Sequence, residues 1–499
     1  MPARKHLVVV VPGIGGSKLA PPGRPDRPVW TAGRRDIGRL LLRPGGLSLA
    51  EHPVLEPVGL IDSLTTFGVW THVHGYEGLM RTLGGLDDAV VDDGTPAGRR
   101  LDATVVALPY DFRLSVTVAT QRLDDEIRQR CAVLWPGEKP AAARVIIVAH
   151  SLGGLVARYW AADPDNAPLC RALITLGTPH RGAPKALDVL ANGIPLGRLG
   201  HWQLPRTVLR EWPSIGELLP RYAVIEDRSR TNTSAVTGEA ALTSGPLVWP
   251  HELGVPWLTE SARQAFAVHQ TIETAWRTMP RDSIEMVPRI GYGHGTARSC
   301  IWDGKEITVS SAAGPHGDGL GQWTDDLGDG TVPAYCGLPL EMDRHAPKQM
   351  RVPYRHMPIV HLAEVVELIK SYEGVPPDMA PIRAGKERPA VLGLDVVETQ
   401  PAGTPIPIIA TIRTDADDVS RVAVWADISP ASLTDDASPG RRLEETRLTW
   451  DPAIHGFHAE LGARKPGLYR LRLTADEVPA GGLLETTAVL EVIDSDQLD

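Results

Sequence analysis

The chain has 499 residues, enough for two or three domains, and its apolar content of 42% is ordinary for a soluble globular protein. Its formal net charge of −10 argues against a nucleic-acid partner and against a general electrostatic attraction to anionic membranes. The four cysteines (Cys131, Cys170, Cys300 and Cys336) have no paired spacing, which predicts neither a disulfide framework nor a zinc site.

The N-terminal segment MPARKHLVVVVPGIGG predicts a core strand over residues 6–11 rather than a signal peptide. Its short apolar run leads into Pro-Gly-x-Gly-Gly and not into a small-residue cleavage site. No stretch of the chain reaches the roughly 18 apolar residues of a membrane span. We therefore expect a cytoplasmic protein.

Strands and helices alternate up to about residue 372. Strand-like runs cover residues 6–11, 104–108, 144–149, 171–176 and 284–291, with a weaker run over 349–354. Apolar residues recur at helical spacing over residues 120–135 and 361–372. This alternation is typical of a mostly parallel sheet covered by helices on both faces, and it assigns residues 1–372 to one α/β domain.

Residues 183–280 interrupt this alternation between two core strands. The segment is long and rich in proline and tryptophan, which favours a cap or lid over an active site. A purely structural insertion is the alternative.

The pattern changes again after a Pro-rich linker, residues 373–389. Residues 390–499 hold about seven short runs with period-two alternation, VLGLDVVE, PIPIIATIRT, RVAVWADI, TRLTW, FHAEL, GLYRLRLTA and TTAVLEVID. Such runs predict an all-β, immunoglobulin-like sandwich. Its His455 and His458 lack partners at a useful spacing, so we expect no catalysis there.

The stretch VIIVAHSLGGLVARYW, residues 145–160, places Ser151 between a buried strand and an amphipathic helix. The nucleophile of an α/β-hydrolase occupies such a turn, with its hydroxyl exposed. The strict motif is G-x-S-x-G, and here Ala149 is the small residue at its first position. His150 points away from the serine by its place in the turn. A turn with a purely structural use is the alternative.

A serine becomes a strong nucleophile when a histidine accepts its proton and a carboxylate fixes the tautomer of that histidine. In this fold the order along the chain is Ser, then Asp or Glu, then His. Asp329, in LGDGTVPAYCG, and His356, in VPYRHMPIVHL, meet this order. Asp325 and Asp326 are the rival acids, and His361 is the rival base.

The backbone N–H groups that would hold the oxyanion are expected from Leu152, directly after the serine, and from Ile14 in the Gly-rich loop after the first strand. The same loop has a competing interpretation as a nucleotide-binding turn. However, a G-x-G-x-x-G pattern starting at Gly13 has Lys18 at its sixth position, and no Gly-Lys-Ser/Thr is present. We therefore expect no nucleotide, no metal and no other cofactor.

Five stretches also resemble those of a known family: VVVVPGIGGSKL, PVWTAG, LPYDFRL, AHSLGGLVARYW, and LGDGTVPAYCGL with the later His356. LPYDFRL is the most discriminating, whereas ALITLGTPHRGAP is common to many lipases and adds less. Over roughly residues 5–372 the chain resembles the lecithin:cholesterol acyltransferase-like α/β-hydrolases, a family that includes lysosomal phospholipase A2 and phospholipid:diacylglycerol acyltransferase.

The resemblance implies roles for the same residues: nucleophile Ser151, acid Asp329, base His356, and oxyanion donors Ile14 and Leu152. It implies a structural ion pair for Asp111 and Arg113 rather than a catalytic one. The chain departs from the family pattern in its sandwich domain. No signal peptide is expected and no disulfide pair is evident near the lid, whereas secreted members have both, so a secreted lipoprotein role is not expected.

These observations predict an enzyme that cleaves or transfers the acyl chains of lipid esters through an acyl-enzyme. Water as the acceptor gives a lipase or phospholipase, and an alcohol gives an O-acyltransferase. The expected partner is a lipid ester, and the cap is a candidate for transient contact with a membrane or lipid surface. Trp249, Trp257 and Trp276, with Leu253 and Leu258, either form an apolar lid over an acyl chain or pack the cap.

Two other functions remain open at this point. One is a small-ester esterase or thioesterase on the same fold. The other is a non-catalytic binding protein with a relic hydrolase domain. The sequence indicates no partner for the sandwich.

Overall fold

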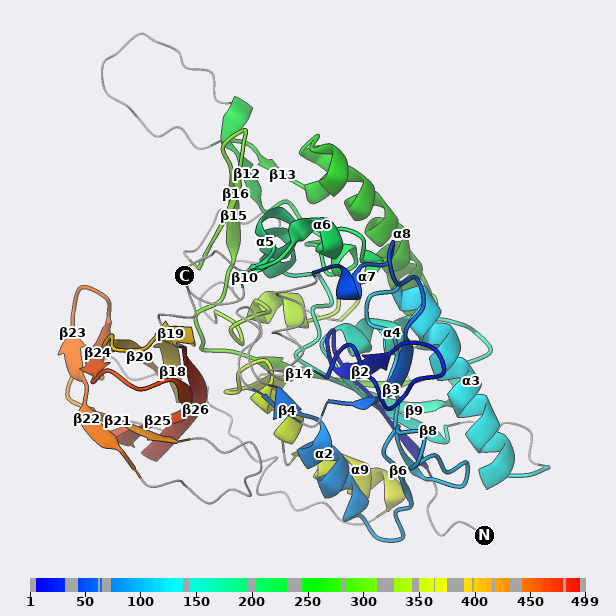
Figure 1. The fold of residues 1–499 in the computed structure, drawn as a ribbon. Coiled ribbons are helices and arrows are strands. Elements are labelled where there is room, and N and C mark those ends of the chain that lie inside the picture. Colours follow the sequence, from blue (N-terminus) through cyan, green and yellow to red (C-terminus); the bar gives the residue numbers. More distant parts are fainter. Residues whose placement is uncertain are drawn as a thin grey trace.

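The computed structural model describes most of the chain, drawn as a coloured ribbon in Figure 1. The described residues are 6–31, 44–61, 63–64, 73–137, 143–195, 203–230, 245–280, 283–311, 327–342, 350–362, 364–374, 390–396, 399–414, 418–430, 442–478 and 482–493. Most of the predicted linker, residues 375–389, lies outside them.

The N-terminal part of the chain is built around a seven-stranded sheet in which every pairing is parallel. The strand order is β17 (Arg351–Val352), β14 (Glu285–Gly291), β9 (Cys170–Leu176), β8 (Val145–His150), β1 (Leu7–Val11), β7 (Val105–Ala107) and β6 (Val91–Asp92). The Val- and Ile-rich runs of β1 and β8 are buried along their whole length, as a parallel sheet covered on both faces requires. The predicted mostly parallel α/β sheet is therefore confirmed, with β6 as an additional strand.

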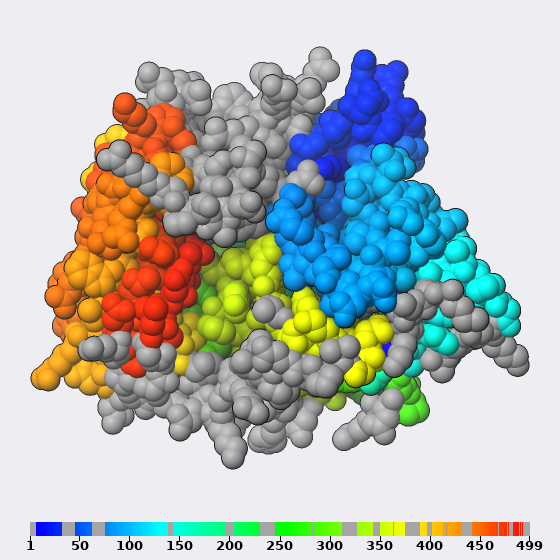
Figure 2. Space-filling model, turned by 90° about the horizontal axis from the view of Figure 1, so that it is seen from below, coloured from blue at the N-terminus to red at the C-terminus, as the bar shows by residue number. Residues whose placement is uncertain are grey.

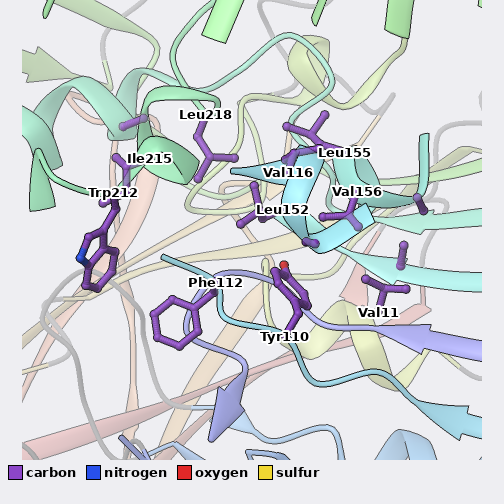
Figure 3. Packing of buried hydrophobic residues seen from close by; sticks show 14 of the residues in the cluster. Val11, Tyr110, Phe112, Val116, Leu152, Leu155, Val156, Trp212, Ile215 and Leu218 are labelled. Atoms are coloured by element: carbon purple, nitrogen blue, oxygen red, sulfur yellow. The ribbon is translucent and has the colours of Figure 1, made fainter. Parts of the chain in front are cut away.

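Helices cover both faces of this sheet. They are α2 (Glu77–Gly84), α3 (Val116–Leu134), α4 (Leu152–Ala161) and α9 (Glu364–Glu373). Successive residues of a strand point to opposite faces. Val8 and Val10 of β1 accordingly pack in a layer with α2 and α9, and Val9 and Val11 in a layer with α3 and α4. Figure 3 shows part of the second layer around α4.

Short elements connect these layers. They are β2 (Ser17–Ala20), β3 (Glu56–Leu60), β4 (Ser63–Leu64), β5 (Val73–His74), η1 (Pro44–Leu47), η2 (Ala167–Leu169), η6 (Ala334–Gly337) and η8 (Pro358–His361). β2 pairs with β3 and β4 with β5, each antiparallel.

The segment between β9 and β14 contains the predicted cap. Its elements are α5 (Pro184–Asn192), β10 (Ile194–Pro195), β11 (Gln203–Leu204), α6 (Arg206–Leu209), α7 (Pro213–Gly216), β12 (Ile225–Asp227), η3 (Arg228–Arg230), β13 (Leu247–Val248), η4 (Pro250–Glu252) and α8 (Pro256–Thr278). A second excursion, after β14, contributes β15 (Ser299–Trp302) and β16 (Ile307–Ser310). These strands complete a four-stranded sheet in the order β13-β12-β15-β16, which the sequence pattern did not reveal.

The C-terminal part forms two packed antiparallel sheets around a core of its own. The strands are β18 (Val391–Val396), β19 (Thr399–Pro401), β20 (Ile406–Arg413), β21 (Ala423–Pro430), β22 (Glu444–Arg447), β23 (Thr449–Asp451), β24 (Gly456–Leu461), β25 (Gly467–Val478) and β26 (Gly482–Ile493). One sheet has the order β18-β20-β24-β23, and the other β19-β26-β25-β21-β22, in which β19 pairs parallel with β26. This is the strand order of an immunoglobulin-like sandwich.

One predicted strand of the sandwich is divided. TRLTW was expected as a single strand, but the chain changes sheets at Leu448, so that β22 and β23 belong to different sheets. The prediction of an all-β sandwich is confirmed. Among the helices that the structure describes, none combines the length and the apolar character needed to cross a membrane.

Candidate active site

Ser151 lies on the turn between β8 and α4, at the carboxyl edge of the parallel sheet. Its φ of 51° and ψ of −123° are a backbone conformation that non-glycine residues rarely adopt. Two glycines, Gly153 and Gly154, allow the first turn of α4 to pack directly against the end of β1 and against Thr178. A Cβ on Gly153 would lie 2.5 Å from carbonyl oxygens of the loop after β1, and a Cβ on Gly154 would collide with Thr178 Oγ1.

The hydroxyl is less accessible than the sequence suggested. An exposed turn was expected, whereas the side chain of Ser151 is only 3% exposed. The reason is that the cap residues cover the turn, so that Ser151 faces an internal pocket rather than bulk solvent.

The structure brings Ser151, Asp329 and His356 together from three loops at this edge. His356 Nε2 lies 3.0 Å from Ser151 Oγ, and His356 Nδ1 lies 2.7 Å from Asp329 Oδ2. A carboxylate only accepts hydrogen bonds, so Nδ1 carries the proton and Nε2 is left to accept the serine hydroxyl. This is the tautomer that a general base acting on Ser151 requires.

The acid is held independently of the histidine. Asp329 Oδ1 accepts the backbone N–H groups of Thr331, at 2.8 Å, and Val332, at 2.7 Å. The backbone N–H of His356 donates to the carbonyl oxygen of Asp329 at 2.9 Å. Because Oδ1 is occupied by the turn, Oδ2 is presented to the imidazole in a fixed direction.

The rival residues occupy other places. His361 is exposed, and its Cε1 lies 2.7 Å from where a Cβ on Gly78 of α2 would be. Asp325 and Asp326 lie outside the described residues. The histidine within hydrogen-bond distance of the serine is thus His356.

His150 belongs to a second hydrogen-bond chain behind the triad. Its Nε2 donates to the carbonyl oxygen of His356 at 2.9 Å, and its Nδ1 accepts the hydroxyl of Tyr76 at 2.7 Å. Tyr76 in turn accepts the backbone N–H of Gly13 at 2.7 Å. Burial lowers the pKa of His150 well below its ordinary value, and the neighbouring His356 adds to the effect. A neutral His150 therefore joins the loop after β1 to the loop that carries His356.

The two backbone amides expected to bind an oxyanion are placed next to Ser151. Leu152 is the first residue of α4, and Ile14 lines the pocket beside the serine. Within the described part of the chain, neither amide donates to a protein acceptor. The loop with Ile14 is fixed by Trp30, whose Nε1 donates to the carbonyl oxygen of Gly15 at 3.0 Å.

An apolar pocket, part of it open to solvent, adjoins Ser151. Its walls include Ile14, Trp30, Leu47, Phe112, Val189, Ile194, Leu204, Trp212, Ile215 and Leu218. Figure 3 shows Phe112, Trp212, Ile215 and Leu218 from these walls. Among the described lining residues Lys185 alone is charged, and its amine lies 3.1 Å from Asp188 Oδ2.

The tryptophans singled out in the sequence pack the cap instead of lining this pocket. Trp276 donates to the carbonyl oxygen of Arg158 at 3.0 Å. Trp257 lies under the guanidinium of Arg210, 3.8 Å from ring centroid to Cζ, and Trp249 contacts Phe266. The cap does cover the pocket, but through residues of α5, β10, β11 and α7 and through Leu218.

Asp111 and Arg113 form a buried ion pair, with 2.7 Å between Asp111 Oδ2 and Arg113 Nη2. Arg113 Nη1 also donates to the carbonyl oxygen of His52 at 2.9 Å. The pair therefore fixes the loop that includes Leu47, a pocket residue, and it does not contact the triad. Among the described residues, no group of three or more His, Cys, Asp or Glu side chains is arranged to hold a metal ion.

Sequence reasoning missed several residues of this site. Tyr76 stands in a stretch with no motif, and only its contact with His150, far along the chain, reveals its role. Gly177 packs against Asp329 and His356. Its position directly after β9 is the signal that could have identified it, because the carboxyl ends of the parallel strands meet at this edge of the sheet. The cap residues of the pocket carry no pattern that separates them from other buried residues.

Residues 88–261 match the family described as lecithin:cholesterol acyltransferase. The resemblance drawn from the motifs is confirmed over this range, which holds LPYDFRL and the serine turn but neither Asp329 nor His356. The match supports an enzyme that hydrolyses or transfers acyl groups. No curated protein sequence matches the chain.

Several solved structures superpose on the chain, but with low TM-scores. Bacillus licheniformis lipase BlEst2 in its propeptide form has 11% identity and a TM-score of 0.31, over 98% of this chain and 94% of that one. The PmoD soluble domain of Methylocystis sp. ATCC 49242 (Rockwell) has 13% identity and a TM-score of 0.17, over 22% and 94%. Superoxide reductase (neelaredoxin) of Ignicoccus hospitalis has 13% identity and a TM-score of 0.15, over 21% and 82%. The fold assignment rests on the sheet topology and not on these overlaps.

Proposed function

We propose that this chain, similar to lecithin:cholesterol acyltransferase over residues 88–261, hydrolyses or transfers the acyl groups of lipid esters with Ser151 as nucleophile. The observation that carries the proposal is Ser151 Oγ, 3.0 Å from His356 Nε2 and at the wall of an apolar pocket. The φ of 51° at Ser151 adds support, because strained non-glycine residues cluster at functional sites.

The proposed reaction has two halves. In the first, His356 Nε2 takes the proton of Ser151 as the serine oxygen attacks the ester carbonyl, and the N–H groups of Ile14 and Leu152 hold the oxyanion. Asp329 stabilises the imidazolium, which then gives its proton to the leaving alcohol. In the second, water or an acceptor alcohol loses its proton to His356 and attacks the acyl-serine, and His356 then gives that proton to the Ser151 oxygen as the bond to the acyl group breaks. The products are a fatty acid or a new ester, and a free serine.

The pocket next to the serine supports an acyl chain as the part of the substrate that is bound there. Each methylene transferred from water into an apolar pocket gains about 0.8 kcal/mol. If that gain is realised in the transition state, kcat/KM rises about fourfold for each added methylene until the pocket is filled. A small-ester esterase or a thioesterase with a short-chain site would show no such rise.

A chain-length series of p-nitrophenyl esters tests this proposal. The kcat/KM values for acetate to dodecanoate should rise steeply, and a fluorophosphonate should label wild-type protein but not Ser151→Ala. A flat series with intact labelling would favour the small-ester alternative. An absence of both turnover and labelling would favour the non-catalytic binding protein.

The acyl acceptor is tested on lipid substrates. Phospholipid vesicles with and without a long-chain alcohol would be incubated with the wild-type chain and with Ser151→Ala. Free fatty acid as the product identifies a lipase or phospholipase, and a new ester identifies an acyltransferase. Either product must depend on Ser151.

The lipid ester is proposed to reach the pocket without docking of the described cap surface on a membrane. Among the described residues between 183 and 280, none of the large hydrophobic side chains is exposed. A vesicle-binding assay with the wild-type chain tests this point, and no binding to neutral vesicles is expected.

We further propose a division into a catalytic domain, residues 1–372 with a cap over 183–280, a linker, residues 373–389, and a sandwich, residues 390–499. The separate apolar core of the sandwich supports this division. Limited proteolysis should cut first within the linker.

A cytoplasmic location is proposed from the cysteines. Cys131, Cys170, Cys300 and Cys336 are unpaired, and the last three are buried, whereas secreted proteins commonly pair their cysteines. Fractionation of cells that express the tagged chain tests the location.

A further inference from the structure

The first strand of the sandwich, β18, has two faces with different partners. Leu392, Leu394 and Val396 belong to the core of the sandwich. Val391 instead packs into a cluster with residues of the α/β part, namely Ile290, Tyr292, Val332, Ala334 and Tyr335. β18 is an edge strand of its sheet, and Figure 1 shows it on the side of the sandwich toward β14.

The two parts of the chain come into close contact at a pair of glycines. A Cβ on Gly393 would collide with the carbonyl oxygen of Gly293, and a Cβ on Gly293 would lie 2.7 Å from Val391 Cγ1. Gly293 follows β14, whose last residue, Gly291, packs against the acid. A Cβ on Gly291 would lie 2.5 Å from Asp329 Cβ. β18 therefore contacts the segment that supports Asp329 from behind.

A hydrogen bond joins the sandwich to the residue before the base. Arg355 Nη1 donates to the carbonyl oxygen of Leu394 at 3.1 Å. The next residue is His356, whose backbone N–H donates to the carbonyl oxygen of Asp329 at 2.9 Å. In Figure 2 a yellow-green band, the colour of residues around 340–360, lies between the orange and red sandwich and the blue N-terminal part.

Val332 connects the same contact region to the carboxylate. Its side chain packs in the cluster with Val391. Its backbone N–H donates to Asp329 Oδ1 at 2.7 Å. Movement of β18 would thus be transmitted to the acid through packed side chains and through a hydrogen bond.

We propose that β18 positions the acid and the base of the triad, so that the sandwich is part of the catalytic unit and not only an attached module. This inference rests on the proposed function, because it concerns the alignment of Asp329 and His356 with Ser151. Both residues lie on loops, which move unless they are packed. A displacement of about 1 Å at reacting groups costs about 10²-fold in rate. Gly393 and Arg355 are positioning residues in this scheme, since neither lines the pocket.

The test uses the full-length chain with one added methyl group. Gly393→Ala pushes β18 away from Gly293, whereas Gly462→Ala is the matched control in the same sandwich. A Cβ on Gly462 first meets the ends of two flexible side chains, Glu444 Oε2 at 3.3 Å and Arg464 Nη1 at 3.4 Å. With p-nitrophenyl butyrate, Gly393→Ala should lower kcat about 10- to 100-fold and leave KM within about twofold. The rate of fluorophosphonate labelling should fall by the same factor, and Gly462→Ala should match the wild type.

A second pair of variants keeps the test decisive if Gly393→Ala does not fold. Arg355→Met removes the donor to Leu394 and should lower kcat and the labelling rate, and Arg355→Lys, which keeps a donor, should recover part of both. Folding is checked by circular dichroism and by the melting temperature.

The outcomes separate the two proposals. One outcome is that the variants are folded at the assay temperature and keep the wild-type kcat and labelling rate, even if their melting temperature is lower. That result would show that the contact region is merely structural, and it would overturn the positioning role alone. A wild-type chain that is neither labelled nor active would instead refute the proposed function, and the positioning role with it.

Discussion

Gly177, directly after β9, is the position where one methyl group tests the alignment of acid and base. A Cβ there would lie 3.1 Å from both Asp329 Oδ2 and His356 Nδ1, the two atoms joined by the 2.7 Å hydrogen bond. Contacts this short require the neighbours to move by a few tenths of an ångström. The φ of 57° adds a backbone penalty of about 1–2 kcal/mol for alanine. We expect Gly177→Ala to lower kcat at least about 10-fold and the free energy of unfolding by about 1–2 kcal/mol.

Gly254→Ala, in the cap, separates the two effects. Gly254 has a φ of 80°, and a Cβ there would have no atom within 4 Å, so its variant carries the backbone strain without the contact. Both variants should lose similar stability in urea unfolding, but only Gly177→Ala should lose kcat on p-nitrophenyl butyrate. Equal losses of kcat in both variants, or a wild-type kcat in Gly177→Ala, would refute the reasoning.

Three further predictions concern the triad and the pH dependence of stability. Ser151→Ala should abolish turnover and change the free energy of unfolding by less than about 1 kcal/mol. Residual turnover in this variant would mean that another residue is the nucleophile. Asp329→Asn and His356→Ala should each lower kcat by about 10³- to 10⁴-fold, while His361→Ala keeps most activity. If His361→Ala lost activity and His356→Ala kept it, His361 would be the base instead of His356. Burial raises the pKa of Glu217 from 4.5 to about 7. Its contribution to stability is therefore fully present below pH 4.5 and is lost as the pH rises through 7. Glu217→Gln should remove this loss, which reaches about 3 kcal/mol by pH 8, and an unchanged pH dependence of urea unfolding would contradict it.

The fold was predictable because its signals are local. β1 and β8 each contain four consecutive β-branched residues, which can be buried on both sides only in a sheet that is covered by helices on both faces. Period-two alternation marks the strands of the sandwich. β6 has two residues, too short for any periodicity, and β17 has two residues within the weaker run predicted over 349–354. β15 and β16 have four each, and only the pairing of β15 with β12, and of β16 with β15, joins them to the strands of the cap.

The proposed triad was predictable for a different reason. A parallel sheet collects the carboxyl ends of its strands at one edge, so polar residues that follow strands far apart in sequence meet there. Ser151 directly follows β8 and His356 follows β17, whereas β15 and β16 lie between β14 and Asp329 along the chain. What the sequence could not provide is the contact between Gly393 and Gly293, because two glycines far apart in the chain carry no pattern that pairs them.

The pocket and the turns that hold Ser151, Asp329 and His356 are constrained by different parts of the chain. The triad is fixed by turns in which glycines leave no room, as at Gly154 and Gly177. The pocket walls come largely from the insertion after β9, where apolar side chains of similar volume exchange at modest cost. The pocket is therefore expected to tolerate apolar substitutions more readily than the turns that hold Ser151, Asp329 and His356.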